Sequence, residues 1–213
     1  MMSVFLFVPN ILGYIRIILL FQACYFMKTN CELTLLTYII SCLLDAVDGC
    51  AARALNQSTK FGAMLDMIVD RCSTMCLLAC LTYFYPSYML FFQISMIIDI
   101  ASHWLHLHSS VLSGKSSHKF IDLKANRFLK LYYTNRVVLF LMCAGNELFY
   151  TMLYIYHFYS GPRVFSFGLW SLLICLTAPI AFLKMLISLI QLHAACVNMV
   201  SLDELERSQN KAD

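Results

Sequence analysis

The chain has 213 residues, of which 61% are hydrophobic and only 13% are charged, and its formal net charge is +3. This composition, with a mean hydropathy of +0.72, excludes a water-soluble globular domain of ordinary type. We therefore expect membrane lipids, and no nucleic acid, among its partners.

Six apolar stretches are long enough to cross a bilayer, because a spanning helix needs about 20 apolar residues. They lie near residues 8–27, 33–52, 63–84, 87–108, 136–158 and 167–192. The sequence therefore predicts an all-α membrane protein, a bundle of six transmembrane helices. We assign residues 1–200 to one membrane domain and residues 201–213 to a charged cytoplasmic tail.

The first stretch carries Pro9 near its start, where the missing N–H group of proline costs little. It has no basic segment before it and is interrupted by Asn10 and Arg16, so we interpret it as a span rather than a secretory signal. Asn10 and Arg16 have two interpretations. Either they are a helix cap and a snorkelling arginine, or they face a polar cavity where the cation pairs with a carboxylate or a phosphate.

The second and third stretches carry four acids at fixed offsets, in the pattern Asp45-x2-Asp48-Gly49-x2-Ala52-Arg53-x8-Gly62-x3-Asp66-x3-Asp70. Spacings of three and four residues place each pair of acids on one face of its helix. Neighbouring acids in an apolar segment repel one another and are costly to desolvate. We therefore predict one or two Mg2+ or Mn2+ ions between these helices, with two expected. An oxygen-only ligand set argues against zinc.

The residues between the two pairs of acids suit a nucleotide diphosphate. Gly49 and Gly62 bracket a polar turn, and the absence of a Cβ atom lets a ligand approach the backbone. Arg53 offers a fork of N–H donors for phosphate oxygens or a base, and Thr59 offers a hydroxyl group just before the third stretch.

The whole segment, DAVDGCAARALNQSTKFGAMLDMIVD, resembles the motif of the CDP-alcohol phosphotransferase family without a departure. Within that family, further segments are similar to the branch that makes phosphatidylinositol in animals: FLFVPNILGYIRI at residues 5–17, DRCSTMCLL at 70–78, FFQISM at 91–96, SHWLHLHSS at 102–110 and CAGNELFY at 143–150. The resemblance covers roughly residues 4–200.

This resemblance implies an enzyme that transfers the phosphatidyl group of CDP-diacylglycerol to myo-inositol by direct attack, giving phosphatidylinositol and CMP. It implies that all four acids bind metal and that Asp70 also accepts the proton of the attacking hydroxyl group. The residues expected to bind CDP-diacylglycerol are Asn10, Arg16, Gly49, Ala52, Arg53, Thr59 and Gly62. A homodimer in the endoplasmic reticulum membrane is implied in the same way.

Two groups of alternatives stay open at this point. The motif by itself also fits a phosphotransferase with another acceptor, such as glycerol 3-phosphate or serine, or one that uses CDP-choline. A cation channel or transporter, in which the acids form a coordinating ring, belongs to a different class. Arg53 and the glycine-bracketed turn are unnecessary for a channel, which makes it the weaker alternative.

The fourth stretch contains Asp99, His103, His106 and His108. On an unbroken helix, His108 points away from His106, so a three-histidine zinc site needs a break in the helix. A charged acid inside the membrane is energetically costly unless it pairs with another group or contacts water. Asp99 lies one helical turn before His103, which can serve as such a partner. We therefore expect Asp99, His103 and Arg136, at the mouth of the fifth stretch, to line the acceptor pocket.

Basic residues in the connections predict the orientation, since cytoplasmic loops are enriched in lysine and arginine. One side carries Arg53, Lys60, Lys115, Lys119, Lys124, Arg127, Lys130 and Arg136, and the other carries only Lys28 and Arg163. This places both termini and the acids on the cytoplasmic side. Among the ten cysteines we expect no disulfide between Cys24 and Cys31, and we expect Cys72, Cys76 and Cys80 to serve in helix packing.

Overall fold

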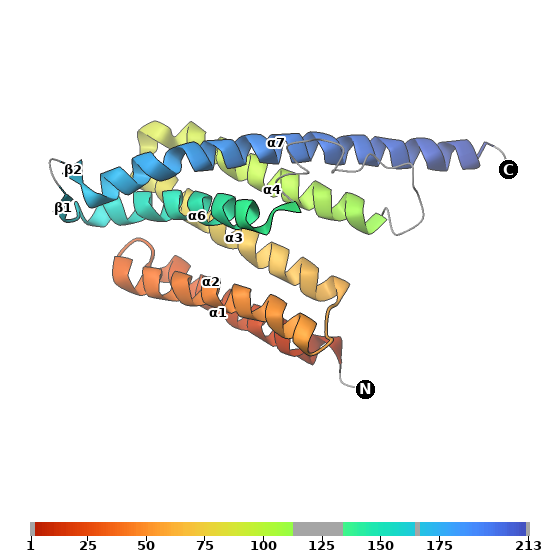
Figure 1. Cartoon of the computed structure of the whole chain (residues 1–213), viewed down its shortest axis with the longest axis horizontal. Coiled ribbons are helices and arrows are strands. Elements are labelled where there is room, and N and C mark those ends of the chain that lie inside the picture. The colour runs from red at the N-terminus through yellow and green to blue at the C-terminus, as the bar shows by residue number, and fades with distance from the viewer. Residues whose placement is uncertain (1–2, 113–133, 165–166, 212–213) are drawn as a thin grey trace. The chain divides into compact units, whose positions relative to one another are not determined.

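The computed structural model of the chain describes residues 3–112, 134–164 and 167–211. These residues form six long α-helices, five of which are long and apolar enough to span a membrane (Figure 1). The prediction of an all-α membrane protein with six helices is therefore confirmed, and the chain is a multi-pass membrane protein. Its contacts divide it into two compact units, Met1–Pro86 and Ser87–Asp213.

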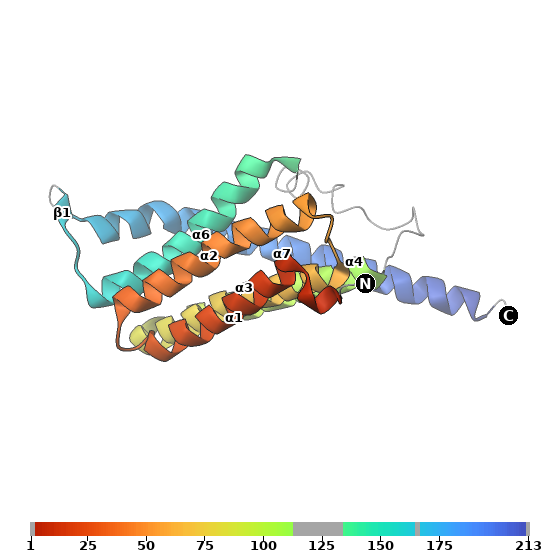
Figure 2. The ribbon, with the colours of Figure 1, turned by 90° about the horizontal axis from the view of Figure 1, so that it is seen from below.

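The first unit contains a short 3-10 helix, η1 (Val4–Leu6), and the helices α1 (Val8–Phe26), α2 (Cys31–Ala54) and α3 (Lys60–Phe84). α1 packs along both α2 and α3, whereas direct packing between α2 and α3 is slight. Figure 2 shows α1 and α2 running antiparallel, joined by a short turn. α1 is therefore the helix that joins the two acid-bearing helices.

Side-chain caps explain where α2 and α3 begin. Asn30 accepts a hydrogen bond from the backbone N–H of Leu33 at 2.9 Å, and Thr59 accepts one from the N–H of Gly62 at 3.0 Å. Each bond satisfies a donor that has no partner inside its own helix. The caps fix where each helix starts, and hence the positions at which the acids follow.

The second unit contains α4 (Met89–Leu112), α6 (Arg136–Phe158), a two-residue hairpin of β1 (Arg163–Val164) and β2 (Phe167–Gly168), and α7 (Leu169–Gln209). The short 3-10 helix η2 (Pro86–Tyr88) leads into α4. α7 packs against both α4 and α6.

α7 is longer than the stretch expected at residues 167–192. It has 41 residues, which at about 1.5 Å per residue is roughly twice the thickness of a bilayer core. The helix continues without interruption past residue 200, where we expected the membrane domain to end, and stops at Gln209. The division into residues 1–200 and 201–213 stays a prediction.

α7 carries a line of buried polar residues that was not predicted from the sequence. Thr177, Lys184, Gln191 and Asn198 are all buried and lie seven residues apart. α4 carries a similar line of buried small residues, Ser95, Ser102 and Ser109, also seven apart. A spacing of seven residues returns to the same helix face, and small polar residues let membrane helices approach closely. This periodicity was the signal that could have identified them from the sequence.

Candidate active site

The turn between α2 and α3 brings the two halves of the motif back toward each other. Asn56 adopts a left-handed conformation with φ of 55°, and the N–H of Gln57 donates to the carbonyl of Ala52 at 2.9 Å. Asparagine is one of the few residues that tolerate this conformation at the end of a helix. Gln57 then accepts a hydrogen bond from the N–H of Val8 at 2.9 Å, which ties the turn to the start of α1.

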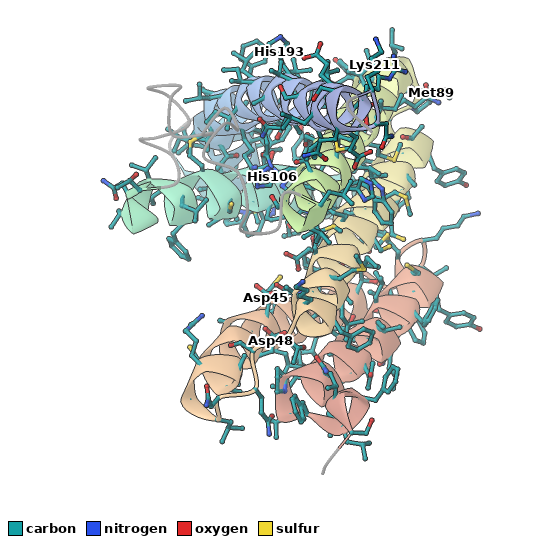
Figure 3. The ribbon with its side chains drawn as sticks, turned by 90° about the vertical axis from the view of Figure 1, so that its right-hand side faces the viewer. Asp45, Asp48, Met89, His106, His193 and Lys211 are labelled. Atoms are coloured by element: carbon teal, nitrogen blue, oxygen red, sulfur yellow. The ribbon has the colours of Figure 1, made fainter. Side chains whose placement is uncertain are left out.

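The four acids converge on one arginine. Arg16 Nη1 lies 2.9 Å from Asp48 Oδ2 and 2.8 Å from Asp66 Oδ1. Arg16 Nη2 lies 2.7 Å from Asp45 Oδ1 and also contacts Asp70 Oδ1. Figure 3 shows Asp45 and Asp48 close together on α2, as their spacing predicted. The second interpretation of Arg16, a cation paired with carboxylates in a polar site, therefore matches the structure.

The acids differ in how accessible they are. The Asp48 side chain is 10% exposed, whereas those of Asp45, Asp66 and Asp70 are 35% to 48% exposed. Asp70 also has a second basic neighbour, because Arg71 Nη2 lies 3.6 Å from its Oδ2 atom. The cluster is therefore open on one side while Arg16, with a side chain 3% exposed, fills its interior.

The geometry of three of the acids fits a divalent metal ion. Asp45, Asp48 and Asp66 each offer a carboxylate oxygen, and these atoms all lie within 4.8 Å of one another. An octahedral Mg2+ ion holds oxygen ligands at about 2.1 Å, so its ligands are about 3 to 4 Å apart. A separation of at most 4.8 Å is close to that spacing. The donor set consists of oxygen alone, which suits Mg2+ or Mn2+.

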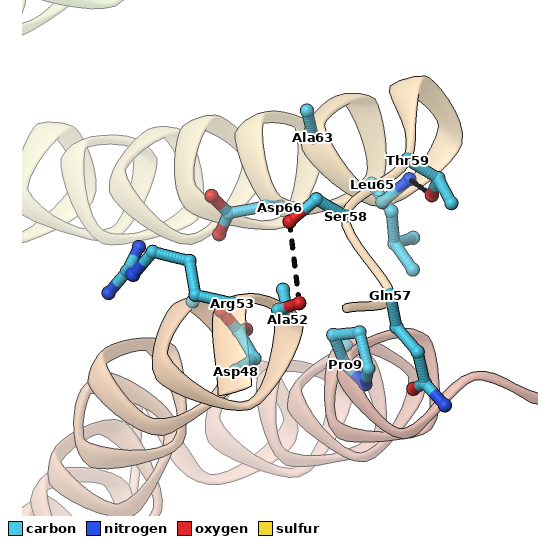
Figure 4. A pocket seen from close by; sticks show the side chains of 13 residues that line it. Pro9, Asp48, Ala52, Arg53, Gln57, Ser58, Thr59, Ala63, Leu65 and Asp66 are labelled. Atoms are coloured by element: carbon cyan, nitrogen blue, oxygen red, sulfur yellow. Dashed lines mark hydrogen bonds between the residues drawn. The ribbon is translucent and has the colours of Figure 1, made fainter. Parts of the chain in front are cut away.

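A cavity of about 190 Å3 opens next to these acids (Figure 4). Five of the seven residues expected to bind CDP-diacylglycerol line it: Gly49, Ala52, Arg53, Thr59 and Gly62. Two of the predicted metal ligands, Asp48 and Asp66, also line it. The rest of the wall was not predicted from the sequence and consists of Pro9, Gly13, Gln57, Ser58, Ala63 and Leu65. Gln57 and Ser58 reach the cavity because Asn56 turns the backbone in a left-handed conformation. The spacing of the motif residues does not predict that turn. Asn10 and Arg16 do not line the cavity.

Asn10 instead lies behind the cavity wall. It is 1% exposed, and its Nδ2 atom donates to the carbonyl of Val4 at 2.6 Å. Its Oδ1 atom has no hydrogen-bond partner among the described residues. A Cβ atom built on Gly62 would lie 2.9 Å from that oxygen and 3.2 Å from Thr59 Oγ1. A Cβ atom at residue 62 would therefore force the buried Asn10 side chain to shift where α3 packs against the start of α1.

Gly49 has a different environment. A Cβ atom built there would meet only the flexible end of Arg53, with Nη1 at 3.5 Å. That distance is an ordinary van der Waals contact, so the fold itself does not require glycine at this position. Gly49 lies inside α2 and borders the cavity, which leaves close approach of a ligand as the reason for glycine.

We therefore expect Gly49→Ala and Gly62→Ala to separate ligand binding from stability. Gly49→Ala should raise the free energy of unfolding by up to about 1 kcal/mol, because alanine is the better helix former, while it raises the KM for the nucleotide ligand of the cavity. Gly62→Ala should lower the melting temperature through the contact with Asn10. Thermal unfolding in detergent and KM measurements on both variants check this. A destabilised Gly49→Ala protein with an unchanged KM would contradict it.

The predicted acceptor residues are described only in part. On α4, His103 Nδ1 lies 2.8 Å from the carbonyl oxygen of Asp99 and 3.4 Å from its Oδ1 atom. The helix runs unbroken from Met89 to Leu112, so His103, His106 and His108 do not share one face, as expected. Arg136 begins α6, but its side chain lies outside the described part of the structure, as do the lysines and the arginine of residues 115–130. The acceptor pocket stays a prediction.

The cysteines are all free, including Cys24 and Cys31. Cys72, Cys76 and Cys80 lie along α3 and are half-buried, and Cys80 Sγ contacts the carbonyl of Met27 at 3.9 Å. This environment agrees with a role in helix packing.

Comparisons with known proteins agree with this geometry. The family model of the CDP-alcohol phosphatidyltransferases matches residues 6–200. The chain is 58% identical over 210 residues to the CDP-diacylglycerol–inositol 3-phosphatidyltransferase of Homo sapiens, covering 98% of both chains. It is 49% identical to the enzyme of that name from Drosophila melanogaster, covering 98% of this chain and 92% of the relative.

The similarity extends to fungi. The Saccharomyces cerevisiae protein with the same name is 40% identical over 197 residues, covering 92% of this chain and 87% of the relative. No solved structure matches the chain. The family match over most of the chain and the shared identity confirm the resemblance expected from the motif, and the chain belongs to the CDP-alcohol phosphatidyltransferase family.

Proposed function

We propose that this protein is a CDP-diacylglycerol–inositol 3-phosphatidyltransferase, which makes phosphatidylinositol and CMP. The observation that carries the proposal is the cavity lined by the motif residues directly beside the cluster of acids. The choice of inositol as acceptor is supported by relatives that bear this name and are 40% to 58% identical over nearly the whole chain.

The donor, CDP-diacylglycerol, occupies the cavity with its nucleotide end. Gly49, Ala52 and Gly62 leave room for the ligand beside the helix backbones, and Thr59 presents a hydroxyl oxygen at the start of α3. Arg53 is exposed at the rim, and its guanidinium group suits a bidentate contact with phosphate oxygens. The lipid tails of the donor stay in the bilayer.

Asp45, Asp48, Asp66 and Asp70 hold the metal ions. The family depends on divalent cations, and we propose Mg2+ or Mn2+, with two ions at the site. When bound, such ions neutralise the diphosphate and stabilise charge on the transferring phosphoryl oxygens and on the leaving CMP.

Asp70 is the proposed proton acceptor. It is the one acid of the four outside the group whose oxygens lie within 4.8 Å of one another, which supports a separate duty. Its carboxylate takes the proton of the attacking inositol hydroxyl as that oxygen forms a bond to the phosphorus of the phosphatidyl group. The bond from this phosphorus to CMP breaks in the same step, and CMP leaves with the bonding electrons.

Asp99, His103 and Arg136 are the proposed residues of the acceptor pocket. The contact between Asp99 and His103 supports a polar environment on α4, since an intramembrane acid is costly without a partner or water. We also propose that the protein is a homodimer of the endoplasmic reticulum membrane. The eight-to-two distribution of basic residues supports cytoplasmic termini and a cytoplasmic active site, from which CMP can leave into water.

The alternatives are less well supported. In a channel with a coordinating ring, the acids surround an open path for ions. Here Arg16 fills the space between them, with contacts of 2.7 to 2.9 Å to three acids. Use of serine, glycerol 3-phosphate or CDP-choline agrees with the motif, but the relatives that cover nearly the whole chain bear the inositol name.

An acceptor assay tests the proposal directly. Purified protein with CDP-diacylglycerol and Mg2+ or Mn2+ is expected to release CMP when myo-inositol is added, and to release far less with serine or glycerol 3-phosphate. Heat-treated protein serves as the control for spontaneous hydrolysis. Release of CMP with another alcohol but not with inositol would assign the protein to a different branch of the family.

A further inference from the structure

Arg16 reaches all four acids from a helix that carries none of them. Its side chain extends from α1, between α2 and α3, which pack little against each other directly. Nη1 contacts one acid of α2 and one of α3, Asp48 and Asp66. Nη2 does the same with Asp45 and Asp70. The guanidinium group thus bridges the two acid pairs twice.

The Nη atoms of Arg16 are directed at the acids. A guanidinium group has five N–H donors; here the Nη groups donate hydrogen bonds to Asp48, Asp66 and Asp70 and form an ion pair with Asp45 at 2.7 Å. The fifth donor, Nε, is buried without a hydrogen-bond partner among the described residues. Because the side chain is 3% exposed and does not line the cavity, Arg16 has no exposed donor for a phosphate of CDP-diacylglycerol.

We propose that Arg16 is a built-in counterion that competes with the divalent cations for the four carboxylates, and thereby sets the metal affinity of the site. It is a positioning residue, which holds the acids of α2 and α3 together before metal binds. This inference rests on the proposed metal-binding role of the acids, and it replaces the expectation that Arg16 contacts the donor.

Competition follows from the geometry. The three oxygens within 4.8 Å of one another belong to Asp45, Asp48 and Asp66, and Arg16 contacts each of these residues at 2.7 to 2.9 Å. A metal ion needs the same carboxylates at about 2.1 Å. A cation and a guanidinium group so close together also repel each other. Metal binding therefore works against the Arg16 contacts.

Removing the charge of Arg16 is expected to have two opposite effects. Without metal, four acids at short range lose their only shared cation among the described residues, so the melting temperature falls. With metal, the competitor is gone, so Mn2+ should bind at least about tenfold more tightly, and it should raise the melting temperature more than in the unaltered protein. A merely structural arginine gives the reverse result, because a loosened site binds metal more weakly.

The experiment measures free Mn2+ by electron paramagnetic resonance as it is titrated into the full-length protein in detergent, without substrate. The proteins compared are the unaltered chain, Arg16→Gln and Arg16→Lys. Arg207→Gln is the matched control, since it removes the same charge from an exposed residue near the end of α7 that belongs to neither the acid cluster nor the cavity. Its Mn2+ affinity should change by less than about twofold. Added guanidinium ion should weaken Mn2+ binding to Arg16→Gln and restore its stability without metal.

Equal or weaker Mn2+ affinity in folded Arg16→Gln would overturn the inference. If Arg16→Gln does not fold, Arg16→Lys decides, because lysine keeps the charge but cannot bridge four carboxylates. Tighter Mn2+ binding than in the unaltered chain supports the inference, and equal or weaker binding overturns it. No substrate is needed, so a failure of the proposed reaction appears in the acceptor assay and not in this titration.

Discussion

The Asp70→Asn variant is expected to bind metal and CDP-diacylglycerol at least in part while it loses most of its turnover. The amide oxygen of asparagine can still coordinate a cation and can still accept from Arg16, which contacts Asp70 Oδ1. An amide cannot accept a proton from the attacking hydroxyl group. The expected loss in kcat is about 10²- to 10⁴-fold, the usual contribution of a general base.

Steady-state kinetics with separate variation of CDP-diacylglycerol and inositol measures this effect. The donor KM should change far less than kcat. Asp203→Asn, at an exposed position near the end of α7, is a matched control and should behave like the unaltered protein. Turnover of Asp70→Asn within a few-fold of the unaltered enzyme would remove Asp70 from its assigned role.

Direct attack of inositol on the donor is expected to invert the configuration at phosphorus. A single displacement inverts it, whereas two displacements through a covalent phosphatidyl-enzyme would retain it. Carboxylates that hold metal are poor candidates for a second duty as nucleophile. Retention of configuration, or isolation of a phosphatidyl-protein adduct, would show a two-step reaction instead.

Removal of divalent metal is expected to abolish activity altogether. The acids carry four negative charges that Arg16 only partly offsets, and a diphosphate donor brings more negative charge to the same place. Activity should return with Mg2+ or Mn2+ and poorly with Zn2+, which prefers nitrogen and sulfur ligands. Asp45→Ala and Asp66→Ala should lose activity in the same way even when metal is abundant.

CMP release after treatment with a chelator, followed by titration of each metal, tests this expectation. Circular dichroism measures the helical content of Asp45→Ala and Asp66→Ala, and so distinguishes a loss of catalysis from a loss of folding. Both variants should keep their helical content, since each acid is partly exposed and lies within a long helix. Full activity after exhaustive removal of metal would refute a metal-dependent transfer.

The lengths of the apolar stretches and the helical repeat made much of this architecture predictable. The spans expected at residues 8–27 and 136–158 correspond to α1 (Val8–Phe26) and α6 (Arg136–Phe158). The spacings of three and four residues between the acids depend only on the helical repeat, and both acid pairs contact the same guanidinium group. Local geometry was sufficient for these predictions because no long-range contact changes the repeat of a helix.

Other features depended on contacts between distant segments. The sequence could not decide whether Arg16 meets a phosphate or a carboxylate, because the answer depends on how α1 packs against α2 and α3. Asn10 was expected at the donor, but it lies behind Gly62 and bonds to Val4. The cavity wall at Gln57 and Ser58 likewise depends on the left-handed conformation of Asn56.

The sequence by itself thus determined the membrane class, the helices, the family and the set of acids, because composition, periodicity and motif spacing are properties of the chain alone. The tertiary structure alone decided that one arginine of α1 contacts all four acids, and that five of the expected donor residues share a cavity. Helices of the same periodicity can pack in many relative positions. Only side-chain packing and the pairing of buried charge select among those positions.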